Sequence, residues 1–139
     1  MTDEEVDRFL RSPVRPGLLA TVRADGRPHV APIWFDVDDD GTVVFTTGED
    51  TVKGRNLRRD GRAALCVQDE QPPFSFVTVE GTVTIGEDLA DVRAWATRIG
   101  GRYLGADQAD AMGERNGVPG ELVVRLSPAK VVAKRDVAL

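Results

Sequence analysis

The sequence predicts a mainly β protein, a small antiparallel barrel of about seven strands with a few flanking helices. Strand-like runs rich in alternating apolar residues follow one another along the chain. Asp25-Gly26 and Asp40-Gly41 separate such runs, and Asp-Gly pairs tolerate the positive φ angles of tight hairpin turns. Strands joined by tight turns are antiparallel, and closure into a barrel hides their edges. With 139 residues, the chain suits one domain spanning residues 1–139.

The first half of the chain predicts three strands and a short helix. The strands span residues 17–24, 28–38 and 42–47, and the helix spans residues 50–60 with Asp50 as its N-cap. The second strand alternates along its whole length, so Ile33, Phe35 and Val37 share one face with Ala31, while Trp34 lies on the opposite face.

The second half predicts strands at residues 62–69 and 74–87, then a helical excursion, then strands at residues 121–126 and 129–135. An amphipathic helix starts at Leu89, and its apolar face includes Trp95 and Tyr103. The Gly100-Gly101 pair predicts that this helix stops or bends there. A second helix fits residues 107–116.

Composition excludes several kinds of chemistry. The net charge is −5, which argues against binding to nucleic acid or to an anionic membrane. One cysteine, Cys66, and one histidine, His29, give neither a disulfide nor a histidine metal site. An acidic N-terminal stretch and the lack of a long apolar run favour the cytoplasm. Any chemistry is therefore expected to come from a bound small molecule.

A basic segment interrupts this acidic chain. Residues 53–62 hold five basic side chains and one acidic one, directly after a strand that ends in Thr46 and Thr47. A helix N-terminus favours anions, so these hydroxyls and Lys53 predict a phosphate site. The spacing fits a solvated basic helix face equally well.

Three stretches in the same order resemble the pyridoxamine-phosphate-oxidase-like split β-barrel superfamily. They are residues 21–34 (TVRADGRPHVAPIW), 53–60 (KGRNLRRD) and 76–82 (FVTVEGT). The chain is most similar to the branch that uses the deazaflavin coenzyme F420, with FMN as the alternative cofactor. The resemblance implies a homodimer with cofactor sites at the subunit interface.

The resemblance also implies which residues bind the cofactor. The second strand lies along the ring, the third strand and the helix hold the phosphate, and the strand near residue 76 reaches the partner's site. In that order, the implied residues are Ala31, Pro32 and Ile33; Thr46, Thr47, Lys53, Arg55 and Asn56; and Phe74 and Phe76. Some relatives carry an arginine two residues before the lysine, where this chain has Thr51. That departure weakens one of the implied phosphate contacts.

The function expected from these features is hydride transfer from reduced F420 to a small conjugated or aromatic substrate. Surplus positive charge at Arg55, Arg58 and Arg59 suits the acidic tail of F420 better than FMN requires. Two alternatives remain open: an FMN-dependent oxidase or reductase, and a protein that binds F420 or haem without turnover. His29 is a weak candidate for a haem ligand.

No residue stands out as catalytic, and no metal site is expected. Cys66 fits a small buried hydrophobe, and Glu80 fits a strand carboxylate with a structural partner. Trp34 suits either stacking on a ring or packing in a dimer. The physiological substrate, the proton donor and the role of the helical segment at residues 88–116 are not predicted.

Overall fold

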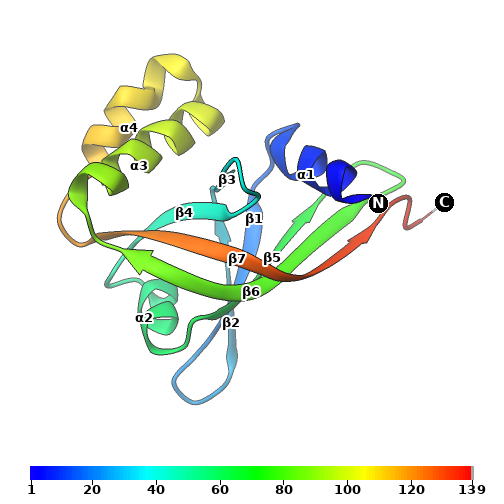
Figure 1. Ribbon diagram of the computed structural model, residues 1–139, viewed down its shortest axis with the longest axis horizontal. Coiled ribbons are helices and arrows are strands. Elements are labelled where there is room, and N and C mark those ends of the chain that lie inside the picture. Colours follow the sequence, from blue (N-terminus) through cyan, green and yellow to red (C-terminus); the bar gives the residue numbers. More distant parts are fainter. Residues whose placement is uncertain (139) are drawn as a thin grey trace.

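A computed structural model, which describes residues 1–138, shows a curled seven-stranded antiparallel sheet with four α-helices around it (Figure 1). The strand order is β2-β1-β5-β6-β7-β4-β3, and every pairing is antiparallel. The sheet closes about half of a barrel, which confirms the predicted mainly β, split-barrel class.

The elements follow one another along the chain as α1 (Asp3–Arg11), β1 (Gly17–Val22), β2 (Pro28–Ile33), β3 (Asp36–Val37), β4 (Val43–Gly48), α2 (Val52–Arg59), β5 (Arg62–Gln68), β6 (Phe76–Gly86), α3 (Leu89–Leu104), the short 3-10 helix η1 (Ala106–Gln108), α4 (Ala109–Asn116) and β7 (Glu121–Lys134). Two hairpins turn at Gly26 and Gly41, each with a φ of +88°, as the Asp-Gly pairs predict.

Helix α1 has no counterpart among the elements predicted from the sequence. Thr2 caps this helix, because its hydroxyl accepts from the Glu5 amide while the Glu5 carboxylate accepts from the Thr2 amide. Leu10 on its inner face joins the main core. The capping pattern is present in the sequence, so this helix was predictable.

The prediction of one continuous strand at residues 28–38 is wrong. The strand ends at Ile33 and resumes as β3, because the Phe35 amide donates to the hydroxyl of Tyr103 on α3, 3.2 Å away. The predicted side-chain alternation holds as far as Phe35, since Ile33 and Phe35 are buried and Trp34 is exposed, but Asp36 is buried together with Val37.

The last two predicted strands are a single strand, β7. Pro128 has no amide hydrogen, but it pairs with Gly81 where the register between β6 and β7 shifts. The strand therefore continues past the proline. The strand predicted at residues 74–87 begins only at Phe76, because Phe74 lies in a turn with a φ of +64°.

Helix α3 passes straight through Gly100 and Gly101 instead of stopping there. A Cβ at Gly100 would overlap the side chain of Met112 on α4, and one at Gly101 would lie 3.0 Å from Ala109. The glycines are thus the surface on which α4 packs against α3, and the lost helix propensity is offset by that close approach.

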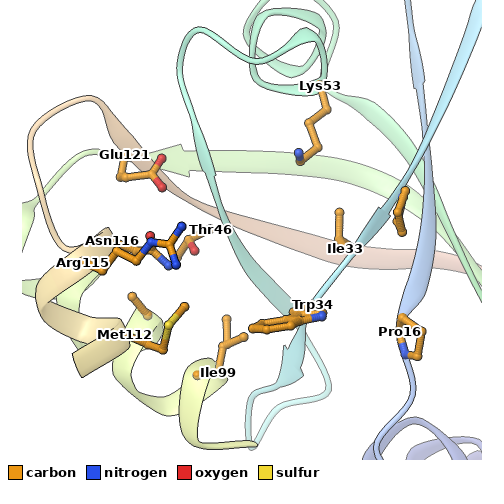
Figure 2. A pocket seen from close by; sticks show the side chains of 13 residues that line it. Pro16, Ile33, Trp34, Thr46, Lys53, Ile99, Met112, Arg115, Asn116 and Glu121 are labelled. Carbon is orange, nitrogen blue, oxygen red and sulfur yellow. The ribbon is translucent and has the colours of Figure 1, made fainter. Parts of the chain in front are cut away.

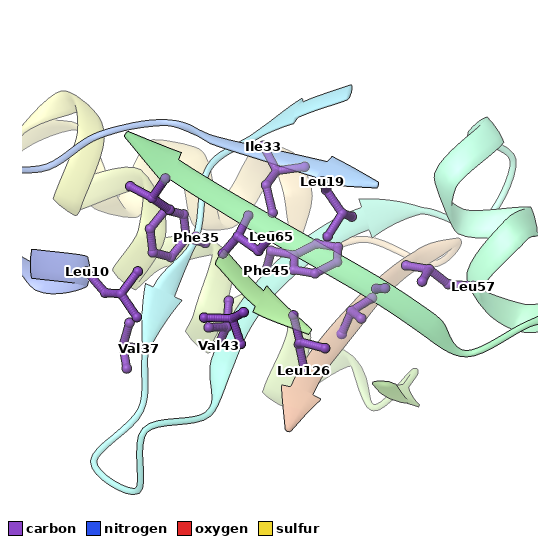
Figure 3. Packing of buried hydrophobic residues seen from close by; sticks show 14 of the residues in the cluster. Leu10, Leu19, Ile33, Phe35, Val37, Val43, Phe45, Leu57, Leu65 and Leu126 are labelled. Atoms are coloured by element: carbon purple, nitrogen blue, oxygen red, sulfur yellow. The ribbon is translucent and has the colours of Figure 1, made fainter. Parts of the chain in front are cut away.

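The main core fills the inside of the curled sheet (Figure 3). Leu19, Phe35, Phe45, Leu65 and Leu126 are fully buried there. A second, smaller cluster holds α3 against the outside of β4 and β7; its buried members are Val44, Val92, Trp95, Ile99 and Val123. That second cluster places α3 and α4 beside the end of β4, where the basic segment begins.

Candidate functional site

A cavity of about 450 Å³ lies between the end of β2, the end of β4, the start of α2 and the α3–α4 pair (Figure 2). Its walls combine apolar and polar side chains from both halves of the chain. The lining residues are Pro16, Pro32, Ile33, Trp34, Thr46, Lys53, Ala96, Ile99, Gly100, Met112, Arg115, Asn116 and Glu121. A volume of this size is typical of a small-molecule site.

The start of α2 is fixed by Thr51, not by Asp50 as the sequence analysis expects. The Thr51 hydroxyl accepts from the Gly54 amide at 3.0 Å and donates to the Gly48 carbonyl at 2.8 Å. It also lies 3.0 Å from the hydroxyl of Thr47, which is buried. Thr51 therefore serves as the N-cap of the helix.

Lys53 and Thr46 face the cavity from α2 and β4. Figure 2 shows the Lys53 ammonium pointing into the cavity across from the end of β2. Among residues 1–138, no carboxylate lies within 4.0 Å of that ammonium. A partly buried lysine ammonium without an ion pair is favourably placed to bind an anion.

Glu121, the first residue of β7, lines the same cavity. Burial raises the pKa of its carboxyl, and the positive charge of Lys53 partly opposes that rise. A raised pKa means that the negative charge of Glu121 is disfavoured here.

Trp34 gives the cavity an aromatic wall. Its ring stacks on the ring of Tyr103, with the centroids 4.9 Å apart and the planes inclined by 4°. The Tyr103 hydroxyl donates to the Arg15 carbonyl at 2.7 Å, and burial raises its pKa. Tyr103 thus holds one face of Trp34, while Trp34 itself remains 41% exposed.

The cavity brings together four of the residues expected to bind a cofactor: Pro32, Ile33, Thr46 and Lys53. The other six lie outside its lining. Of these, Thr47 is turned into the protein and Ala31 is half-buried on β2. Phe74 is 43% exposed in its turn, and Phe76 is half-buried at the start of β6.

Arg55 and Asn56 lie at a different hollow, of about 280 Å³. Asn56 is buried, and its amide donates to the Thr21 hydroxyl at 3.0 Å and accepts from Arg59 at 2.9 Å. Arg59 also donates to the Val22 carbonyl. Asn56 therefore ties α2 to β1.

The surplus charge expected for an acidic tail is largely engaged within the chain. Arg58 forms ion pairs with Glu87 and Glu49, and Arg59 bonds to Asn56. Of these three arginines, only Arg55 is exposed without such a partner within residues 1–138. The number of basic residues in the sequence therefore overstates the positive charge that α2 can offer to a ligand.

The lining residues that α3 and α4 contribute carry no signal of a site in the sequence; they are Ala96, Ile99, Gly100, Met112, Arg115 and Asn116. They reach the cavity only because α3 and α4 dock on β4 and β7 through contacts distant in the chain. The helical segment at residues 88–116 thus forms one wall of the cavity.

Other candidate residues lie elsewhere. His29 does not line this cavity, and its Nδ1 is buried with no hydrogen-bond partner among residues 1–138. Cys66 is half-buried on β5 with its thiol free, so it is less buried than the sequence analysis expects. In that same part of the chain, no cluster of three or more His, Cys, Asp or Glu side chains is arranged to hold a metal ion. None of the helices found there has the length and apolar character needed to cross a membrane.

The chain is similar in sequence to known redox enzymes. A 5a,11a-dehydrotetracycline/5a,11a-dehydrooxytetracycline reductase of Streptomyces rimosus is 39% identical over 119 residues, covering 84% of this chain and 71% of the relative. An F420H2-dependent biliverdin reductase of Mycobacterium tuberculosis is 33% identical over 88 residues, covering 62% of this chain and 61% of the relative.

A solved structure described as an F420 reductase superposes with a TM-score of 0.69 at 29% identity, covering 89% of this chain and 93% of that one. The family model described as pyridoxamine 5'-phosphate oxidase matches residues 2–135, nearly the whole chain. The chain belongs to the pyridoxamine 5'-phosphate oxidase family.

Proposed function

We propose that this protein is an oxidoreductase that binds F420 in the cavity and reduces a small conjugated or aromatic substrate. The observation that carries this proposal is the Lys53 ammonium, which faces a cavity of about 450 Å³ with no carboxylate within 4.0 Å in the described chain. Relatives whose names specify F420 and reduction support the choice of cofactor and of reaction.

The residues present suit a planar redox cofactor with a phosphate. Lys53 and Thr46 would hold the phosphate beside the start of α2, where the helix dipole adds a favourable field. Pro32 and Ile33, with Ala31 before them, would lie along the ring system. Thr47 and Asn56 would act indirectly, because their side chains fix the start and the inner face of α2.

The cofactor, once bound in its reduced form, supplies a hydride, and the protein supplies binding and orientation. An electron-poor carbon–carbon double bond would accept the hydride and one proton. We assign that proton to solvent. Trp34 and Ile99 would form part of the wall beside the reacting face.

The protein is expected to work as a homodimer. The outer faces of β1, β2 and β7 expose Leu18 at 45%, Val30 at 59% and Val131 at 43%. Such an apolar sheet surface favours a second copy of the chain. Phe74 and Phe76 lie at one end of β6, from which they would reach the partner's cofactor. We place the reaction in the cytoplasm, where a free thiol such as Cys66 stays reduced.

The test is a titration of the purified protein with F420, FMN and haem, followed by tryptophan fluorescence. F420 is expected to bind most tightly, and Lys53→Ala is expected to weaken it by about 10- to 100-fold, as loss of a charge-assisted hydrogen bond would. Lys134→Ala, at an exposed lysine of β7 outside the cavity, is the matched control.

Each alternative has its own outcome. Tighter binding of FMN than of F420 would make the protein a flavin enzyme. Binding of F420 without reduction of a panel of enones and quinones would leave a cofactor-binding protein. Unchanged F420 affinity in Lys53→Ala would contradict the phosphate site.

A further inference from the structure

The arginine at the end of α4 differs from the other arginines of the helical pair. On α3, Arg98 bonds to Asp36 at 2.8 Å, Arg102 donates to the Arg11 carbonyl at 2.9 Å, and Arg93 lies 3.6 Å from Glu114. Within residues 1–138, Arg115 has neither an ion pair nor a hydrogen bond from its side chain. It lines the cavity instead, and Figure 2 shows it directed inward from α4.

Asn116 follows Arg115 and lines the same part of the cavity. Its side chain is half-buried and forms no hydrogen bond within the described chain. A guanidinium beside an amide presents several N–H donors, a set that matches the two oxygens of a carboxylate. The helix C-terminus accounts for a positive charge at this position, but it does not account for two unpaired donor side chains facing a cavity.

Trp34, on another wall of the cavity, favours a ligand with a flat ring. Tyr103 covers one face of its ring, so a ligand in the cavity meets the opposite face and the edge. Because stacking on Tyr103 and the hydrogen bonds of Tyr103 fix the ring, Trp34 is a rigid platform for a second planar group.

We infer that Arg115 and Asn116 bind a carboxylate of the substrate while Trp34 stacks on its ring, so that the substrate is a planar conjugated acid. This assignment rests on the proposed function, because the bound acid is the molecule that is reduced. Lys53 is reserved for the cofactor phosphate. It stands on α2, whereas Arg115 stands on α4, so the cavity has separate positions for two anions.

The test uses 2-naphthoate and its uncharged methyl ester as probes with the same ring. Both are titrated by calorimetry into the protein alone and into the protein saturated with oxidised F420. The wild type is expected to bind the acid at least about tenfold more tightly than the ester, as one charge-assisted hydrogen bond would give. Arg115→Gln is expected to remove that preference, and Arg115→Lys to restore part of it.

Two further variants separate the contributions. Arg93→Gln, which removes an arginine of α3 that does not line the cavity, is expected to keep the full preference for the acid. Trp34→Leu is expected to weaken acid and ester by the same factor, because it removes stacking and leaves the charge.

An acid-to-ester ratio that stays the same in Arg115→Gln would overturn the assignment. So would weaker F420 binding in Arg115→Gln with that ratio intact, because Arg115 would then bind the cofactor's tail. Failure of wild-type protein to bind F420 would contradict the proposed function alone, since the titration without cofactor still measures the preference for the acid.

Discussion

Replacing Thr51 by alanine should destabilise the protein through one hydroxyl group. That hydroxyl accepts from the Gly54 amide at 3.0 Å and donates to the Gly48 carbonyl at 2.8 Å. Its hydrogen is used toward Gly48, so Thr47 must be the donor in the 3.0 Å contact between the two threonines. Alanine would therefore remove the helix cap and leave the buried Thr47 hydroxyl without an acceptor.

The expected loss follows from these two effects. Removing an N-cap costs about 1 kcal/mol, and leaving a buried hydroxyl unsatisfied costs about 1–2 kcal/mol more. For 139 residues, the entropy of unfolding is about 0.3 kcal/mol/K, so a loss of about 2–3 kcal/mol lowers Tm by about 7–10 °C. Differential scanning calorimetry at fixed pH measures this shift.

Thr51→Ser is the matched control, because serine keeps the oxygen and is an equally good N-cap. Its Tm should stay close to that of the wild type. A Tm for Thr51→Ala within about 2 °C of the wild type would refute the reasoning, as the cap alone should exceed that shift. An equal fall in both variants would assign the effect to the methyl group.

Three further predictions concern other contacts. Asp36→Asn should lower the free energy of unfolding by about 3 kcal/mol, because the buried carboxylate pairs with Arg98 at 2.8 Å; the midpoint of urea denaturation measures this. Tyr103→Phe should cost about 1–3 kcal/mol in the same assay, since the hydroxyl bonds to one backbone carbonyl and one backbone amide. Asp60 should titrate by NMR with a pKa of about 2, held down by hydrogen bonds from Arg62, and Arg62→Gln should raise that pKa. Because the folded-state pKa is lowered, the stabilisation from Asp60 is present above its ordinary pKa of 3.8 and is lost as the pH falls through about 2.

The sheet was predictable from the sequence because its signals are local. Alternation places Ile33 and Phe35 on the buried face, and the Asp-Gly pairs place the turns at Gly26 and Gly41. The predicted strand boundaries are wrong where a contact between residues distant in the chain determines the structure. β2 ends early because Tyr103, far along the chain, binds the Phe35 amide.

The candidate site was predictable on one side only. Lys53 and Thr46 belong to a stretch whose charge and position at a helix start are visible in the sequence. Whether a charge is free is not visible, because it depends on partners brought close by folding. Arg58 is engaged by Glu87, whereas Lys53 is left open.

The wall formed by α3 and α4 was not predictable, and its attachment explains why. Val92 and Trp95 pack on Val44 and Val123, and Asp36 receives Arg98, so the helical pair docks on the outside of β4 and β7 and on β3. None of these contacts involves α2. Substitutions on the inner side of α4 are therefore expected to leave the start of α2 intact.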